Sequence, residues 1–453
     1  MGLLWIVEAM LLGCLLVYRF TDLAAAQPSW AGWLLVFGAG AAGGMGLASA
    51  LFFLLGVVGG IPAAAMMVEL AGLAAAAWMV FRGAEKKESP GAARYPMRVT
   101  LWLAALSALA LATAGMAAAW QWNPQGNWDA WAIWNLRARF LSAGGGLASR
   151  AWSPALAGAT HTEYPLLVSS FVARCWAYSH ALSQAVPAAA SYAFFLALIA
   201  LAAGGLAALR GPALGLSAGL VLLATPALLR EVPAQYADVP LACYVAGAVI
   251  FALLERPVLA GVFAGLAAWT KDEGLLFLAV FLAVTVLLRR RTWLQTALGA
   301  LPAAVLALAF KAMLPKGTTS LLSASAGGAG HRVVDFGRAG TILAEFGRQF
   351  ASMGVQWYHP ILPLAALAVA LRFDGGRRRD LAFGAAVAGL LLLGESAVYM
   401  VTANSLEWQL QTSLGRLLVQ VWPVLVVTAV LALRQPERLA VVEVAKTRKK
   451  QRG

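Results

Sequence analysis

Long apolar runs follow one another along most of the chain, with short polar segments between them. Runs of this length predict helices. They fall at 3–18, 31–57, 60–82, 99–120, 186–209, 212–229, 238–254, 257–271, 274–289, 293–313, 359–372, 381–401 and 414–434. A helix of about 20 apolar residues crosses the roughly 30 Å hydrocarbon core of a bilayer. The pattern therefore predicts an all-α polytopic membrane protein with about thirteen transmembrane helices.

Composition agrees with this class. Of the 453 residues, 61% are hydrophobic and only 12% are charged, whereas a soluble domain carries about 25% charged residues. The first residues, Met1 to Trp5, include no basic residue, so we expect no cleaved secretory signal. The three cysteines, Cys14, Cys175 and Cys243, lie far apart in or beside apolar runs. This spacing indicates neither a disulfide framework nor a metal site, and small core residues are the simpler interpretation.

The positive charges mark one side of the membrane. The net charge is +14, and much of the excess lies in segment 83–98, in Arg289–Arg291, in Arg377–Arg379 and in the tail 435–453. Short loops rich in Lys and Arg stay in the cytoplasm. Together with the Ala-, Gly- and Arg-rich composition, this predicts a multi-pass protein of the cell inner (plasma) membrane with a cytoplasmic C-terminus. Nucleic acid is not an expected partner, because the charge serves as a topology signal.

One further segment, Glu163 to His180, is apolar enough to suggest another spanning helix. It is short, and it carries Arg174 and His180, which are costly at bilayer depth. If it crossed the membrane, every later basic cluster would move to the outer side. We therefore predict an amphipathic helix that lies in the outer interface. With this choice all the basic clusters face the cytoplasm.

Three outward-facing regions follow from this topology. They are the loop 121–185, the short turns at 230–238, 271–274 and 402–413, and the loop 314–358. Loops this long at a membrane surface are usually functional or disordered, and the Ser/Gly-rich stretch 318–330 is predicted to be mobile. The sequence shows no internal repeat, which disfavours a transporter, since many transporters have duplicated halves.

The first outer loop opens with a tryptophan-rich stretch around the sequence NWDAW. Trp131, Trp134, Ala138 and Leu141 have helical spacing and predict one stripe of an interface-bound helix. Asp129 precedes them, near the membrane surface, and is the only carboxylate between Glu88 and Glu163.

Asp129 is a candidate general base that removes a proton from an acceptor hydroxyl or amine. Arg137 and Arg139 follow it, and a guanidinium fork is well shaped to hold a phosphate. The simpler alternative is a helix N-cap aspartate, with arginines that touch lipid headgroups.

Further charged side chains lie in the first outer loop, in the outer turns and at the outer ends of the predicted helices. Each has a simpler interpretation as a helix cap or an interfacial anchor. Together they would gather carboxylates and cations on one face, as an anionic, sugar-bearing lipid substrate requires. These candidates are His161, Glu163, Asp238, Lys271, Asp272, Glu395, Glu407 and Arg416. Glu8 and Glu69 also lie inside apolar runs, where a charge is costly and often functional, and pairing with polar neighbours is the simpler interpretation.

From residue 99 to about residue 434 the chain resembles the GT-C glycosyltransferases, which include protein O-mannosyltransferases and the lipid A aminoarabinose transferase. The matching motifs occur in the family's order. An acidic motif opens the first outer loop, a stretch similar to His-Pro-Pro-Leu follows, and an Asp-containing turn and a Gly-Leu-x-x-x-x-Lys segment come next. In this sequence they are NWDAW, HTEYPLL, QYADVPL and GLAAWTKDEG.

The resemblance implies a GT-C-like architecture with interfacial helices in the first outer loop. It also implies a polyprenyl-phosphate sugar donor and inverting transfer on the outer, periplasmic face. Asp129 would be the catalytic base, while Asp238, Lys271 and the loop arginines would surround the donor phosphate or sugar. The acceptor would be a lipid, a glycan or a protein, and membrane lipid would surround the protein.

The same resemblance divides the chain into parts. These are a three-helix extension at 1–98, a catalytic module at 99–313, an outer loop at 314–358, C-terminal helices at 359–434 and a basic cytoplasmic tail at 435–453. Asp129 lacks the second acidic residue of an Asp-x-Asp, which disfavours a divalent metal, and no cofactor is expected. The histidine motif is altered at His161, and the three N-terminal helices are additional to the minimal pattern.

The sequence thus predicts a membrane glycosyltransferase that moves a hexosyl or pentosyl unit. Two alternatives stay open. A transporter or flippase of a lipid-linked or anionic solute would use the same arginines without chemistry. A ligase or polymerase of lipid-linked oligosaccharide would use the same outer face.

Overall fold

The computed structural model describes residues 1–82, 99–156, 160–315, 332, 334–402 and 404–436. Within these ranges the regular elements are helices, and two isolated β-bridges are the sole strand-like pairs. The predicted basic segment 83–98, the Ser/Gly-rich stretch 318–330 and the end of the tail, 437–453, lie outside the described residues. The all-α class is confirmed.

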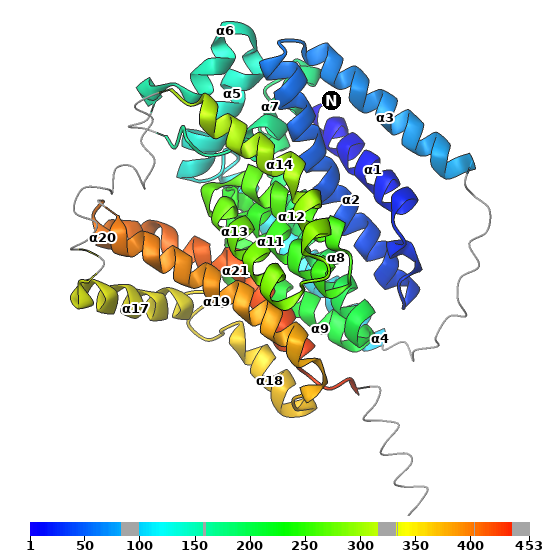
Figure 1. Ribbon diagram of the computed structural model, residues 1–453, viewed down its shortest axis with the longest axis vertical. Coiled ribbons are helices and arrows are strands. Elements are labelled where there is room, and N and C mark those ends of the chain that lie inside the picture. Colours follow the sequence, from blue (N-terminus) through cyan, green and yellow to red (C-terminus); the bar gives the residue numbers. More distant parts are fainter. Residues whose placement is uncertain (83–98, 157–159, 316–331, 333, 403, 437–453) are drawn as a thin grey trace, which may run out of the picture.

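The first three helices pack against the rest of the bundle (Figure 1). They are α1 (Gly2–Phe20), α2 (Ser29–Leu51, continued by a π-helical segment Phe52–Val58) and α3 (Pro62–Arg82). Small residues allow α1 and α2 to approach closely, because a Cβ added at Gly13 would lie 1.9 Å from the carbonyl oxygen of Gly40. Close backbone contact at small residues is a common way for helices to associate in membranes.

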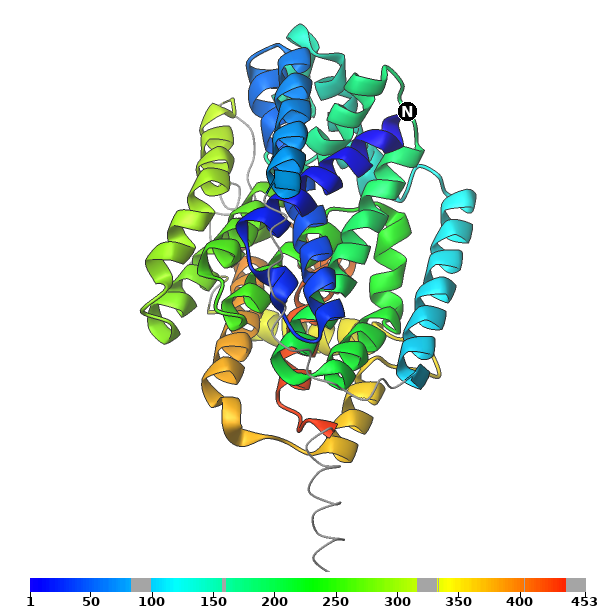
Figure 2. The same cartoon turned by 90° about the vertical axis from the view of Figure 1, so that its right-hand side faces the viewer.

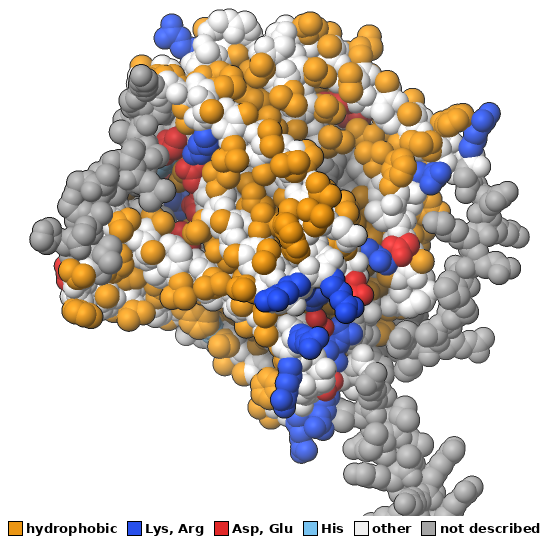
Figure 3. Space-filling model, in the orientation of Figure 1, with side chains coloured by type: hydrophobic (Ala, Val, Ile, Leu, Met, Phe, Trp, Pro, Cys, Tyr) orange, Lys and Arg blue, Asp and Glu red, His pale blue; other side chains and the backbone are white. Residues whose placement is uncertain are grey.

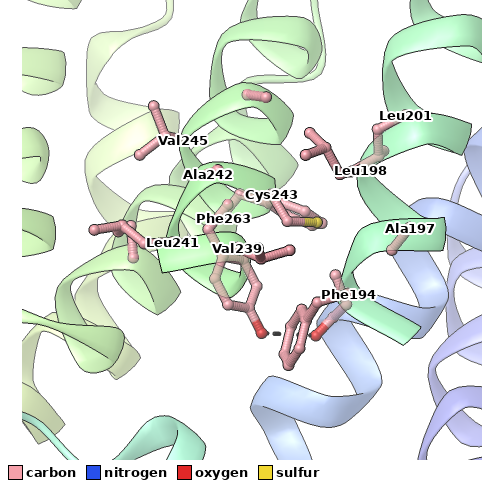
Figure 4. Packing of buried hydrophobic residues seen from close by; sticks show 14 of the residues in the cluster. Phe194, Ala197, Leu198, Leu201, Val239, Leu241, Ala242, Cys243, Val245 and Phe263 are labelled. Carbon is pink, nitrogen blue, oxygen red and sulfur yellow. Dashed lines mark hydrogen bonds between the residues drawn. The ribbon is translucent and has the colours of Figure 1, made fainter. Parts of the chain in front are cut away.

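Eight helices form the centre of the molecule. They are α4 (Val99–Trp122), α8 (Ala185–Arg210), α9 (Pro212–Leu223), α10 (Pro226–Ala234), α11 (Asp238–Leu253), α12 (Pro257–Thr270), α13 (Asp272–Leu288) and α14 (Trp293–Met313). Helix α11 is buried along its whole length and packs against α8, α12 and the last helix. Phe194, Leu198 and Phe263 pack around Val239 and Cys243 in this core (Figure 4). Of these eight helices, α4 is the exception, because it stands at the edge of the bundle rather than in its centre (Figure 2).

The first long loop folds back on the bundle as short helices. They are a π-helical turn Ala130–Trp134, α5 (Asn135–Ala143), α6 (Gly145–Ala148), the 3-10 turns Ser149–Trp152 and Pro154–Leu156, and α7 (Leu167–Ser179). The π-helical turn changes the predicted stripe, because its wider winding leaves Trp131 exposed while Trp134, Ala138 and Leu141 stay buried.

Helix α7 is the segment for which an amphipathic interfacial helix is predicted. The helix exists and, at 13 residues, is too short to cross a bilayer. It does not lie on the surface with one free face, however, because residues 171–176 are all buried by neighbouring helices. Arg174 of this helix is paired with carboxylates inside the protein. The pairing offsets the cost of burying its charge, and that cost was the reason to predict a surface position.

The C-terminal part adds an amphipathic helix and four more helical segments. These are α17 (Phe336–Ala351), α18 (Ile361–Leu371), α19 (Arg378–Val401), α20 (Leu406–Gln409) with a π-helical turn Leu410–Leu414, and α21 (Gly415–Leu431). Helix α17 lies in the predicted outer loop 314–358 and packs against α19 and α21. The Asp335 carboxylate caps it by accepting the Arg338 backbone N–H.

Each of the thirteen predicted runs forms helix, but the count of about thirteen spans is not confirmed. Among the described residues, 8 helices are long and apolar enough to cross a membrane, or 9 if the pair α9 and α10, bent by 62°, makes one span. Helices α11, α12 and α18 are shorter, at 16, 14 and 11 residues. The protein is therefore a multi-pass membrane protein. Judged by helix length and composition alone, it has 8 or 9 candidate spans among the described residues rather than about thirteen.

Arginines gather at one end of the bundle, as the charge pattern predicts. Arg289 of the α13–α14 connection and Arg377 before α19 both pair with Asp380. The side chain of Arg377 also donates to the carbonyl oxygen of Leu209, at the end of α8. Figure 3 shows this basic region at the lower edge of the molecule, away from the short helices of the first loop in Figure 1.

Candidate functional site

Four residues that the sequence singles out come together at the other end of the bundle. Asp129 directly precedes the π-helical turn of the first loop, and Asp238 is the first residue of α11. Lys271 connects α12 to α13, and Arg416 is the second residue of α21. With Glu273 they form what we name the charged cluster. Figure 3 shows acidic and basic side chains together near α13 and α14.

Arg416 joins the two aspartates of this cluster. Its Nη1 pairs with the Asp129 carboxylate, and the same nitrogen lies 3.8 Å from Oδ2 of Asp238. The guanidinium lies over the ring of Tyr236, 5.1 Å from its centroid. The Tyr236 hydroxyl accepts the backbone N–H of Asp129 at 3.4 Å, so the loop and the start of α11 hold Asp129 in place.

The inner half of the cluster is centred on Asp238. Its Oδ1 accepts hydrogen bonds from Nζ of Lys271 at 3.1 Å and from the side-chain amide of Gln420 at 2.5 Å. Lys271 also lies 2.8 Å from a carboxylate oxygen of Glu273. Burial lowers the pKa of Lys271, but Asp238 and Glu273 outweigh it and hold the pKa above its ordinary value. Lys271 is therefore a cation at neutral pH.

The solvent exposure of the side chains decreases from one end of the cluster to the other. The side chains of Asp129 and Arg416 are 21% and 19% exposed, whereas those of Asp238 and Lys271 are 0% and 4% exposed. Asp129 can therefore meet a molecule that arrives from the surface, while Asp238 and Lys271 lie behind it. A general base must be reachable by the proton it removes.

In the cluster, the carboxylates outnumber the cations. Asp129, Asp238 and Glu273 supply three carboxylates, and Lys271 and Arg416 supply two cations. An incoming phosphate therefore has to take the place of a carboxylate beside one of the cations. The more exposed pair, Asp129 with Arg416, is the easier one to separate.

His161 and Glu163 lie next to the cluster through Tyr164. The His161 ring stacks on Tyr164 at 4.6 Å between centroids, and its Nδ1 lies 3.0 Å from Glu163. Nζ of Lys271 lies 5.7 Å from the centroid of the same Tyr164 ring. The Tyr164 ring also stacks with Trp134, at 5.7 Å between centroids. The HTEYP segment thus forms an aromatic wall beside Lys271.

The side chain of Arg137 makes its hydrogen bonds within the first loop. Its side chain is fully buried and donates to the backbone carbonyl oxygens of Ala151, His161, Thr162 and Tyr164. Burial lowers its pKa to about 10, so it stays protonated at neutral pH. These bonds tie α5 to the segments around residues 151 and 161–164 of the same loop. We therefore assign Arg137 to the loop structure rather than to a donor phosphate.

The remaining candidates divide between the rim of the cluster and other places. Asp272 pairs with Lys311 at 2.5 Å beside the cluster, and buried Glu395 faces Glu273 and Lys271. Arg139 is exposed and lines a separate cavity. Glu407 is exposed, and its side chain accepts from Gln411 at 3.2 Å, with no cluster residue in contact among those described.

Glu273, Tyr236 and Gln420 belong to the site but are not among the candidates predicted from the sequence. Gln420 stands one helical turn after Arg416, so both project from the same face of α21. A polar residue four positions after an arginine in an apolar run was the available signal. Glu273 and Tyr236 lie beside Lys271 and Asp238 in turns that the sequence marks as polar, but adjacency alone does not say which side chain points inward.

Metal binding has no ready-made site in the part of the chain that the structure describes, where no group of three His, Cys, Asp or Glu side chains is arranged for an ion. Comparisons of the chain with protein-family models, curated proteins and solved structures found no match. The charged cluster itself therefore carries the functional assignment.

Replacing Lys271 with methionine tests the inner half of the cluster. Asp238 would keep Gln420 and the more distant Arg416 but lose its closest cation, and a donor phosphate would lose one as well. If the substrate is the polyprenyl-phosphate sugar that the sequence resemblance implies, its apparent KM should rise about tenfold or more. Lys311→Met is the matched control, since Lys311 pairs with Asp272 at the rim. Equal effects of the two variants would remove Lys271 from donor binding.

Proposed function

We propose that this protein is an integral membrane glycosyltransferase of the GT-C type. It transfers a sugar from a polyprenyl-phosphate donor to an acceptor on the outer, periplasmic face. One observation carries the proposal: Asp129, Asp238, Lys271 and Arg416, which lie up to 287 residues apart in the sequence, meet in one partly open charged cluster. The resemblance to GT-C motifs predicts a site from the first three of these residues.

Donor binding exchanges one ion pair for another in this mechanism. The donor phosphate approaches Arg416 from the surface and takes the position of the Asp129 carboxylate. Lys271 lies behind it as a second cation and is held in place by Asp238. An arginine-paired carboxylate is a weaker base than a free one, so separation from Arg416 prepares Asp129 for proton transfer only when donor is present.

The transfer step then needs one base and one stabilised leaving group. Asp129 accepts the proton of the acceptor hydroxyl or amine while that atom forms a bond to the anomeric carbon of the sugar. The bond between the anomeric carbon and the phosphate oxygen breaks, and the phosphate leaves with the electron pair. Arg416 and Lys271 stabilise the negative charge that develops there. Lipid phosphate, the protonated base and the glycosylated acceptor balance the reaction.

The proposed orientation places the charged cluster outside and the arginine-rich end in the cytoplasm. Single cysteines at Ser149, in the first loop, and at Arg290, between α13 and α14, test it, because both positions are exposed. A membrane-impermeant maleimide is expected to label Ser149→Cys in intact spheroplasts and Arg290→Cys only after permeabilisation. The unmodified protein is the background control, since Cys14 is half-buried while Cys175 and Cys243 are buried. Labelling in the opposite order would invert the orientation.

The class of activity is tested with purified protein in liposomes and a panel of polyprenyl-phosphate sugars. Transfer of labelled sugar, or slow hydrolysis of the donor, is the expected result. A flippase would move the intact lipid between leaflets with no loss of the sugar. A ligase or polymerase would release lipid phosphate only from donors that carry an oligosaccharide. Either of the last two results would overturn the proposed reaction.

A further inference from the structure

We propose that a cavity of about 200 Å³ beside the charged cluster binds a single sugar unit that carries a carboxylate. The cavity lies between the start of the first loop, α5 and the start of α8. Its role as acceptor site rests on the proposed function, whereas its ligand chemistry follows from its own walls. Those walls include Trp131, Asn135, Arg139, Trp176, Gln184 and Gln235.

Gln235 supplies the strongest sign of a missing ligand. It is 3% exposed, and its side-chain amide nitrogen donates to the carbonyl oxygen of Pro124 at 3.1 Å. Its side-chain oxygen is also buried and has no hydrogen-bond partner. Native proteins rarely leave a buried polar atom unsatisfied, and such atoms often mark functional positions. Less than 1 Å² of this oxygen is accessible, so a ligand hydroxyl in the cavity would satisfy it only after the Gln235 side chain shifts.

The backbone of Gln235 supports the same interpretation. Its φ is +59°, a left-handed conformation that non-glycine residues adopt uncommonly. Gln235 is the C-cap residue of α10, where this conformation is common, and the cap fixes the place from which the side chain projects. The amide bond to Pro124 fixes which end of the side chain is the oxygen, since only the nitrogen can donate.

Arg139 supplies the preference for an anion. It is exposed on α5 and lines the cavity, and no described carboxylate forms an ion pair with it. By contrast, the guanidinium of Arg137, two positions earlier on the same helix, donates its hydrogen bonds to loop carbonyl oxygens. A free guanidinium presents a planar fork that matches a carboxylate.

The aromatic and amide side chains indicate that the anion belongs to a sugar. Trp131 is 44% exposed, so its indole surface is available to a ligand ring. Asn135 and Gln184 add amide groups, which both donate and accept hydrogen bonds as hydroxyl groups require. Sites for drug-sized molecules occupy roughly 300–1,000 Å³, so a smaller cavity suits one ring rather than an oligosaccharide.

The cavity and the charged cluster are neighbours along two segments. Gln235 directly precedes Tyr236, whose hydroxyl accepts the Asp129 N–H. Trp131 follows Asp129 by two positions. The two segments that hold the proposed base, 127–135 and 234–236, therefore also line the cavity. This places the acceptor, rather than the donor phosphate, in the cavity.

Binding of glucuronate to purified protein in phosphatidylcholine nanodiscs tests this inference. Saturation-transfer NMR is expected to detect glucuronate, with glucose bound at least tenfold more weakly. Arg139→Gln is expected to weaken glucuronate binding at least tenfold, and Trp131→Ala should weaken glucuronate and glucose alike. Arg150→Gln is the matched control, an exposed arginine of the same loop that does not line the cavity.

Three outcomes would overturn the inference. They are the absence of glucuronate binding, unchanged binding in Arg139→Gln, and full competition by inorganic phosphate or by phosphatidylglycerol in the nanodisc. The last would assign the cavity to a phosphate or a lipid headgroup. Asp129→Asn separates this test from the proposed reaction, because glucuronate binding should persist in that variant even when transfer is lost.

Discussion

Replacing Arg174 with alanine is expected to destabilise the protein by about 3–5 kcal/mol. Arg174 is fully buried on α7, and its guanidinium pairs with Glu8 of α1 and Glu69 of α3. It also donates to the carbonyl oxygen of Trp5 at 2.8 Å. Alanine would leave two buried carboxylates without a cation, and an unpaired buried charge is among the costliest defects known. One side chain thus fastens the first loop to the N-terminal helices.

The measurement is the melting temperature of purified protein in detergent, followed by size-exclusion chromatography. A decrease on the order of 5–10 °C is expected for Arg174→Ala. The matched control removes all three charges, as Arg174→Met with Glu8→Leu and Glu69→Leu. Replacing a whole buried ion network with apolar residues is often neutral, so this variant should recover most of the lost stability. A melting temperature equal to wild type for Arg174→Ala would refute the arrangement.

Replacing Asp129 with asparagine is expected to reduce sugar transfer about 10²–10⁴-fold, the usual contribution of a general base. Asparagine has the same shape but cannot accept the acceptor proton. The apparent KM for donor should stay close to wild type or fall, because Arg416 no longer has a carboxylate to exchange for phosphate. The rate is measured with labelled donor in liposomes.

Glu407→Gln is the control for the Asp129 variant. Glu407 lies in the segment that leads into α21, but it is exposed and contacts Gln411 rather than the cluster. Its loss should leave transfer unchanged within about twofold. Transfer at the wild-type rate in Asp129→Asn would remove the base assignment and leave Asp129 as an anchor for Arg416.

Much of the fold could be predicted from the sequence because apolar run length is a strong signal. The predicted run at 238–254 and the observed helix Asp238–Leu253 differ at one end by a single residue. The meeting of Asp129, Asp238, Lys271 and Arg416 was also accessible, since all four lie at polar breaks between apolar runs. Consecutive membrane helices run in opposite directions, so every second connection between them lies on the same side of the membrane. Polar connections on that side can therefore come together in one site.

The remaining features depend on contacts between distant parts of the chain. Glu8, Glu69 and Arg174 each look costly alone, and only their pairing across α1, α3 and α7 explains them. Arg137 resembles a phosphate ligand by type, but four loop carbonyl oxygens bind it. The pattern of long apolar runs does not predict helix α17, although Ile342 and Phe346 show helical spacing after the Asp335 cap.

The central claim is that Asp129, Asp238, Lys271 and Arg416 form one site for a phosphate-linked donor. A cryo-electron microscopy structure with bound polyprenyl phosphate tests it most directly. The claim predicts phosphate density within ion-pair distance of Arg416 and Lys271, with the Asp129 carboxylate moved away from Arg416. Phosphate density elsewhere in the protein, with the Asp129–Arg416 pair intact, would contradict it.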